Sequence, residues 1–177
     1  MKKFFTTKRL CRAGVIAALY AGLTYAFAPF AFGPLQVRPA EALCLLAAFF
    51  PEAIPVLYVG CMLSNLASPY FFYDVFLGSL ATLLAAVFTY LVAKFLKKEP
   101  LRLILCGVFP VLFNALIIPL IIVFFCGGGE GFASVAIAYF TYAGSIAFKE
   151  IVWVYGLVTL LYFQMKRIQR GGKDFFS

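Results

Sequence analysis

The sequence predicts an all-α integral membrane protein, a single bundle of six transmembrane helices that occupies residues 1–177. Hydrophobic residues make up 64% of the chain and charged residues 12%, which is about half of the charged share typical of a soluble domain. Several apolar stretches approach the roughly 20 residues that a helix needs to cross a bilayer. These stretches are continuous rather than alternating, which argues against an antiparallel barrel.

The distribution of basic residues predicts the orientation of the bundle. Cytoplasmic loops of membrane proteins retain Lys and Arg, and here the basic residues gather at every second gap between apolar stretches. We therefore expect both ends of the chain, residues 1–11 and 166–177, to lie in the cytoplasm. The net charge of +8 then reflects topology and does not indicate nucleic acid binding. The groups are Lys2, Lys3, Lys8, Arg9 and Arg12; Lys94, Lys97, Lys98 and Arg102; and Lys166, Arg167, Arg170 and Lys173.

The first expected span runs from about Arg12 to Phe30 and carries small residues at a spacing of four, which places them on shared helix faces. Such faces let a second membrane helix approach closely, either within the bundle or from another protein. Ala26-Phe27-Ala28 also resembles a signal-peptide cleavage site, but Pro29 follows directly and we expect no cleavage. The two small faces are Ala13, Ala17 and Ala21, and Gly14, Ala18 and Gly22.

A short polar stretch from Gly33 to Glu41 separates the first two apolar stretches and contains Gln36, Arg38 and Glu41. A charge at mid-membrane costs about 2.5–3.5 kcal/mol, so we place this stretch at the outer surface. Pro39 suits the first position of a helix, and Glu41 then lies where the helix N-terminus favours a carboxylate. The second span, Pro39 to Phe50, would be about 18 Å long as an α-helix, too short to cross without tilting.

The third span is expected from Pro55 to about Ala67 and the fourth from about Val75 to Phe95. Asn65 could bridge helices through hydrogen bonds or contact a ligand. Asp74 is placed to cap the fourth helix, although a binding role stays open.

The fifth span, about Leu103 to Phe125, contains Asn114 between Pro110 and Pro119, where kinks free backbone carbonyls. Asn114 could satisfy those carbonyls or contact a ligand. The sixth span is expected from about Ile146 to Met165, preceded by a helical extension or a bend near Gly144. Lys149 and Glu150 are adjacent and so point about 100° apart on a helix. Each needs its own partner, and we expect Glu150 to face a cavity.

The sequence contains no motif that would indicate a metal-binding protein, a nucleotide-binding protein or an enzyme. The five cysteines have no CxxC spacing and there is no histidine, so we expect no metal and no other cofactor. Cys126-Gly127-Gly128-Gly129-Glu130-Gly131 lacks the Lys-Ser/Thr of a phosphate loop, and no nucleophile–base pair predicts an enzyme. Polar groups near one end, among many aromatics, instead indicate a pocket for a small, flat, polar solute.

The stretch Phe32-Gly33-Pro34-Leu35-Gln36-Val37-Arg38-Pro39-Ala40-Glu41-Ala42-Leu43 resembles the signature of the queuosine-precursor transporter family, QueT. These proteins are substrate-binding S components of energy-coupling factor (ECF) transporters. Further similarity lies in Phe50-Pro51-Glu52-Ala53-Ile54-Pro55, in Gly60-Cys61 with Asn65, and in Asp74 to Thr82. Pro39 departs from the family pattern, in which a less rigid residue is expected.

The resemblance implies the S-component fold and a membrane coupling subunit (EcfT-like) driven by two cytoplasmic ATPases. It implies that Ala13, Ala17 and Ala21 face that coupling subunit. The substrate implied is a deazapurine base such as queuine or an aminomethyl precursor. The candidate carboxylates for its N–H groups are Glu41, Asp74 and Glu150, and the remaining candidate contacts are Gln36, Arg38, Asn65, Asn114 and Lys149.

Three other functions stay open from the sequence. An S component for a vitamin would share the fold and the partners. A self-contained channel or secondary transporter would need an internal repeat or a pathway through both faces, and the chain shows no repeat. A purely structural membrane subunit would bind no ligand.

Overall fold

The computed structural model describes residues 6–32, 37–96 and 98–171, which are mainly helical and contain no strand. The all-α prediction is therefore confirmed for this part of the chain. The α-helices are α1 (Thr7–Ala26), α2 (Ala28–Ala31), α3 (Ala53–Asn65), α4 (Phe71–Tyr73), α5 (Ser79–Phe95), α6 (Glu99–Leu120) and α7 (Val135–Gly171). A 3₁₀-helix, η1 (Pro39–Ala48), and two π-helices, η2 (Asp74–Gly78) and η3 (Ile121–Phe125), complete the series.

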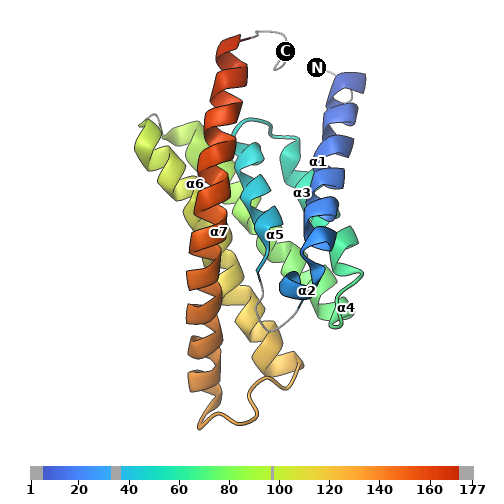
Figure 1. Cartoon of the computed structure of the whole chain (residues 1–177), viewed down its shortest axis with the longest axis vertical. Helices are drawn as coiled ribbons and strands as arrows, with labels where there is room; N and C mark the ends of the chain where they lie inside the picture. Colours follow the sequence, from blue (N-terminus) through green and yellow to red (C-terminus); the bar gives the residue numbers. More distant parts are fainter. Residues whose placement is uncertain (1–5, 33–36, 97, 172–177) are drawn as a thin grey trace.

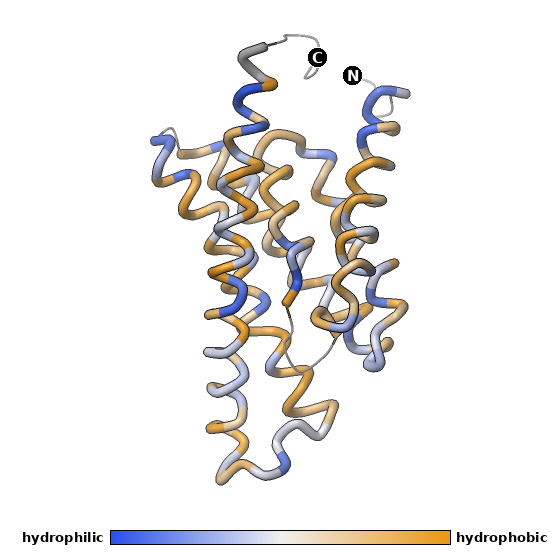
Figure 2. The backbone as a smooth tube through the Cα atoms, in the orientation of Figure 1, coloured by the Kyte–Doolittle hydropathy of each residue, from blue (hydrophilic) through white to orange (hydrophobic). Residues whose placement is uncertain are grey.

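The long elements run up and down one axis, so that α1 begins and α7 ends at the same end of the molecule (Figure 1). Three helical stretches have the length and apolar composition to cross a membrane: Phe71–Phe95, Glu99–Phe125 and Val135–Ile168. Figure 2 shows the apolar character of these segments. They establish a multi-pass membrane protein. The shorter apolar helices Pro39–Ala48 and Ala53–Asn65 leave the expected six crossings a prediction.

The 3₁₀-helix η1 lies at the centre of the bundle. It packs against α1, α3, α5, α6 and α7, and every residue from Pro39 to Ala47 is buried. One side joins an apolar core with α1 and α3, and the other joins a second core with α6 and α7. The expectation of an α-helix here was wrong. A 3₁₀-helix rises about 2.0 Å per residue, and the small side chains of Ala40, Cys44 and Ala47 let this narrower helix pack tightly on all sides.

Ion pairs and hydrogen bonds join neighbouring segments at the end of the molecule where α1 begins. Arg12 lies 3.4 Å from Glu52 and over the ring of Phe50, which joins α1 to the turn between η1 and α3. Arg102 donates to the carbonyl of Ala48 at 3.2 Å, where a cation favours the C-terminus of η1. At the same end, Glu99 of α6 pairs with Lys166 of α7 and accepts a hydrogen bond from Tyr162 at 2.6 Å.

Two boundaries differ from the sequence-based expectation. The fourth helical stretch begins at Phe71, before Asp74, and the Asp74 side chain makes no capping hydrogen bond. The prediction of an N-cap at Asp74 was therefore wrong, because the helix already has a turn in front of it. α7 is one continuous helix from Val135 to Gly171, so the chain uses the helical extension and not a bend near Gly144. Pro119 is followed by the π-helix η3.

The two faces of small residues on α1 lie in different surroundings. Ala13, Ala17 and Ala21 are half-buried, and Gly60 of α3 approaches so closely that an added Cβ would lie 3.5 Å from the Ala17 Cα and 3.3 Å from the Tyr20 Cβ. Gly14, Ala18 and Gly22 are exposed, and a Cβ at either glycine would meet nothing within 4 Å. The first face therefore borders α3 and the second points out of the bundle.

Replacing Gly60 with leucine is expected to force α1 away from α3, because overpacking a tight contact costs about 1–3 kcal/mol. The apparent melting temperature of the purified protein in detergent should fall relative to Gly156→Leu, a matched change at an open position on α7. Equal melting temperatures for the two variants would contradict the close contact between α1 and α3.

Candidate ligand-binding site

The charged and amide side chains that are buried in the described interior come from five segments and are here called the buried polar cluster: Arg38, Glu41, Asn65, Asp74, Asn114 and Glu150. Each is at most 4% exposed. Arg38 and Glu41 lie at the start of η1, Asn65 ends α3, Asp74 begins η2, and Asn114 and Glu150 lie within α6 and α7. The expectation that Arg38 and Glu41 sit in a surface loop was therefore wrong, since the surrounding helices enclose them.

The Glu41 carboxylate is held by neutral donors from two other helices. Its Oε1 accepts hydrogen bonds from the Tyr20 hydroxyl of α1 at 2.5 Å and from the Thr82 hydroxyl of α5 at 2.7 Å. Its Oε2 accepts a longer bond from the Cys44 thiol at 3.5 Å. The thiol is within reach because residues three apart eclipse each other in a 3₁₀-helix. Glu41 thus joins α1, η1 and α5, and it does not cap its own helix.

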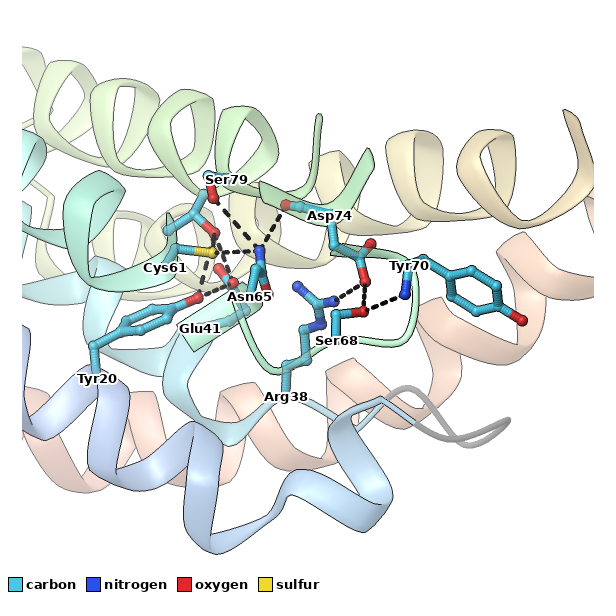
Figure 3. Close-up of polar contacts among 10 residues, drawn as sticks. Tyr20, Arg38, Glu41, Cys61, Asn65, Ser68, Tyr70, Asp74 and Ser79 are labelled. Atoms are coloured by element: carbon cyan, nitrogen blue, oxygen red, sulfur yellow. Dashed lines mark hydrogen bonds and ion pairs between the residues drawn. The ribbon is translucent and has the colours of Figure 1, made fainter. Parts of the chain in front are cut away.

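Arg38 faces Asp74 across the cluster, with Nη2 3.7 Å from Oδ2 (Figure 3). The Ser68 hydroxyl donates to the same Asp74 oxygen and accepts a bond from the backbone N–H of Tyr70 at 3.1 Å. Gly78 packs closely on this region, because an added Cβ would lie 3.2 Å from the Asn65 Nδ2. Asp74 therefore orients the guanidinium, and its own position is fixed by Ser68.

Asn65 makes helix-bridging hydrogen bonds, one of the two roles that the sequence left open for it. Its Nδ2 donates to the backbone carbonyl of Asp74 at 2.7 Å and lies 3.4 Å from the hydroxyl of Ser79 and from the sulfur of Cys61 (Figure 3). These contacts tie the end of α3 to η2 and α5. The other amide atom, Oδ1, has no hydrogen-bond partner among the described residues.

The cluster concentrates buried polar atoms that lack a hydrogen bond within the described protein. Six of the eight such side-chain atoms belong to it: Arg38 Nε and Nη2, Asn65 Oδ1, Asn114 Oδ1 and Nδ2, and Glu150 Oε2. A buried group without a partner costs about 1–3 kcal/mol, and such groups are rare in native proteins. The set contains donors and acceptors, so it can take a ligand that offers both.

Glu150 belongs electrostatically to the same group of residues. It interacts electrostatically with Glu41 and Arg38 at the start of η1. Lys149, its neighbour in the chain, is half-buried and makes no ion pair with any described residue. The structure thus buries Glu150 and leaves Lys149 outside the contacts that define the cluster. That Glu150 faces a cavity stays a prediction.

Sequence reasoning missed the side chains that position the cluster: Tyr20, Cys44, Cys61, Ser68, Ser79 and Thr82. A signal for Tyr20 was present, because Ile16, Tyr20 and Thr24 recur every four residues and are the buried face of α1. Gln36, the remaining predicted contact, lies outside the described residues. Within residues 6–32, 37–96 and 98–171, no three His, Cys, Asp or Glu side chains are arranged to hold a metal ion.

Comparison with known proteins identifies the family of this chain. Residues 10–167 match the sequence profile of the family described as QueT transporter. A 71-residue stretch is 38% identical to a protein of Lactococcus lactis subsp. cremoris (strain MG1363) named queuosine precursor transporter QueT. That stretch covers 39% of this chain and 41% of the relative. No solved structure is significantly similar. Because the family profile covers most of the sequence, the chain belongs to the QueT transporter family, a family of transporters and not of enzymes.

Proposed function

We propose that this protein is the substrate-binding S component of an ATP-driven ECF importer in a bacterial cell membrane. It captures a queuosine precursor, a deazapurine base, in the buried polar cluster. In this proposal the chain crosses the membrane six times with both ends in the cytoplasm. A coupling subunit of the EcfT kind and two cytoplasmic ATPases supply the energy. Support comes from the family and from the name of the Lactococcus relative.

One observation carries the assignment of the site: the buried donors and acceptors that lack partners in the described protein. A guanine-like edge has adjacent N–H donors beside a carbonyl oxygen, and a carboxylate can accept both N–H groups. Arg38 Nε offers a donor for the carbonyl, while Nη2 faces Asp74. The Asn114 amide offers a hydrogen-bond acceptor, Oδ1, and a donor group, Nδ2. A deazapurine ring also carries both hydrogen-bond donors and acceptors.

The three carboxylates differ in how many hydrogen bonds they already accept within the protein, and therefore in how well they can bind the N–H groups of the base. Glu41 already accepts bonds from Tyr20, Thr82 and Cys44. Asp74 accepts from Ser68 and faces Arg38. Glu150 has an Oε2 without a hydrogen-bond partner in the described chain. We therefore assign Glu150 as the carboxylate that accepts the N–H groups of the base.

Coupling is proposed along α1. The exposed face of Gly14, Ala18 and Gly22 offers a surface that another helix can approach closely. The half-buried Ala13, Ala17 and Ala21 border it and complete the proposed contact with the coupling subunit. Because Ala17 also packs on Gly60, a change at Ala18 tests docking with less disturbance of the bundle.

The Glu150→Gln variant is expected to bind a deazaguanine base roughly 10- to 100-fold more weakly, because a hydrogen bond to a charged group contributes about 1.5–3 kcal/mol. Isothermal titration of the purified protein in detergent measures this affinity. Glu130→Gln, at an exposed glutamate of the loop before α7, should bind like the wild type. Unchanged affinity in Glu150→Gln would remove Glu150 from the site.

The Ala18→Leu variant is expected to lose ATP-dependent uptake and co-purification of the coupling subunit while base binding persists. A bulky side chain on this face blocks close helix approach. Gly144→Leu on α7, where an added Cβ meets nothing within 4 Å, is the control and should retain uptake. Full uptake by Ala18→Leu, or uptake without any ATPase, would contradict the proposed coupling.

A further inference from the structure

A groove lies at the end of the molecule where α1 begins, between the first turns of α1 and the segment that leads from η1 into α3. Its volume is about 680 Å³, and most of the residues that line it are apolar. Leu10 and Ala13 line it from α1, and Ile54 and Val56 line it from α3. No member of the buried polar cluster lines this groove, so it is a separate feature of the bundle.

Two charged residues, Arg9 and Glu52, complete the lining of the groove, and they differ in their partners. Glu52 lies 3.4 Å from Arg12, whose guanidinium also lies over the ring of Phe50. Arg9 is half-buried and makes no ion pair with a described residue. Because Glu52 is already paired with Arg12, at least one positive charge remains at the groove, on Arg9.

The groove lies where the apolar body of the bundle meets its basic end. Figure 2 shows hydrophilic residues at the beginning of α1 and near the end of α7, next to helices that are mostly apolar. Leu10 is 64% exposed and directly follows Arg9 in the chain, so an apolar surface adjoins the cation. In a membrane protein, arginine occupies this level with its stem along the apolar surface and its charge among the lipid headgroups.

From this geometry we infer that the groove binds a phospholipid with an anionic headgroup, which places an acyl chain between α1 and α3 and its phosphate beside Arg9. The apolar walls bury the chain, and a guanidinium binds phosphate through paired N–H groups. A zwitterionic headgroup brings its own cation, for which the groove offers only Glu52, already paired with Arg12.

Charge complementarity also favours a lipid over a helix of another protein. An apolar helix would cover the same walls but would leave Arg9 against apolar side chains. Ala13 lines the groove and also belongs to the proposed contact with the coupling subunit. A bound lipid therefore competes with docking at this end of α1.

Native mass spectrometry of the full-length protein in detergent measures which lipid it retains. The protein is equilibrated with equal amounts of phosphatidylglycerol, which is anionic, and phosphatidylcholine with the same acyl chains. The wild type should retain phosphatidylglycerol preferentially, and Arg9→Gln should reduce this retention roughly fivefold while leaving that of phosphatidylcholine unchanged. Lys98→Gln is the control, because it removes an exposed cation just before α6, which begins on the far side of the same end (Figure 1). It should retain phosphatidylglycerol like the wild type.

A second variant tests the apolar walls. Ala13→Phe places a ring in the groove and should lower the retention of both lipids, because the acyl chain loses its space. Equal retention of the two lipids by the wild type, or unchanged retention of phosphatidylglycerol by Arg9→Gln, would overturn the inference. It would also be overturned if Arg9→Gln kept the lipid and lost co-purification of the coupling subunit, since the groove would then belong to a protein partner.

Discussion

The carboxylate of Glu41 imposes the constraint on which much of this structure depends. A carboxylate enclosed among apolar helices must receive hydrogen bonds, and Glu41 receives them from Tyr20 on α1 and Thr82 on α5. The central helix η1 is thereby placed between these helices, with small residues toward its neighbours. Because Arg38 directly precedes the same helix, the position of η1 also decides where the guanidinium can reach.

Polar groups in the bundle divide into those that hold the protein together and those that remain available. Glu41 Oε1, Asn65 Nδ2 and the Ser68–Asp74 pair bridge elements and are satisfied. Arg38, Asn114 and Glu150 contribute atoms that make no hydrogen bond within the described chain. The first set costs little because its bonds are made within the protein. The second set is tolerated where a bound ligand returns the lost hydrogen bonds.

Part of the fold could be predicted because local rules act on it. Pro39 marked the start of a helix, and the structure confirms that Glu41 is its third residue. Adjacent Lys149 and Glu150 were expected to face different surroundings, and only Glu150 is buried. The burial of Arg38 and Glu41 depends instead on how α1, α3 and α5 close around η1. No local sequence pattern predicts how these helices close around η1. The free-energy cost of a charge within the membrane therefore led to the prediction that both residues lie at the surface.

The residues that position the buried polar cluster could not be predicted from the sequence for a related reason. Tyr20 and Thr82 look like ordinary members of apolar helices, and their role follows only from the distance to a carboxylate in another element. Asp74 was predicted to cap a helix because the three aromatic residues before it, which form α4, were interpreted as part of a loop. Small residues on α1 were visible in the sequence, but which face borders α3 required the position of Gly60.

The buried polar cluster is proposed to bind a deazapurine base. The most direct test of this proposal is competition binding to the purified wild-type protein in detergent, with queuine as the labelled ligand and 7-deazaguanine precursors, guanine and a panel of vitamins as competitors. The account predicts saturable binding that the precursor bases displace, that guanine displaces more weakly and that the vitamins do not affect. Displacement by a vitamin alone, or no binding by protein shown to be folded, would contradict it.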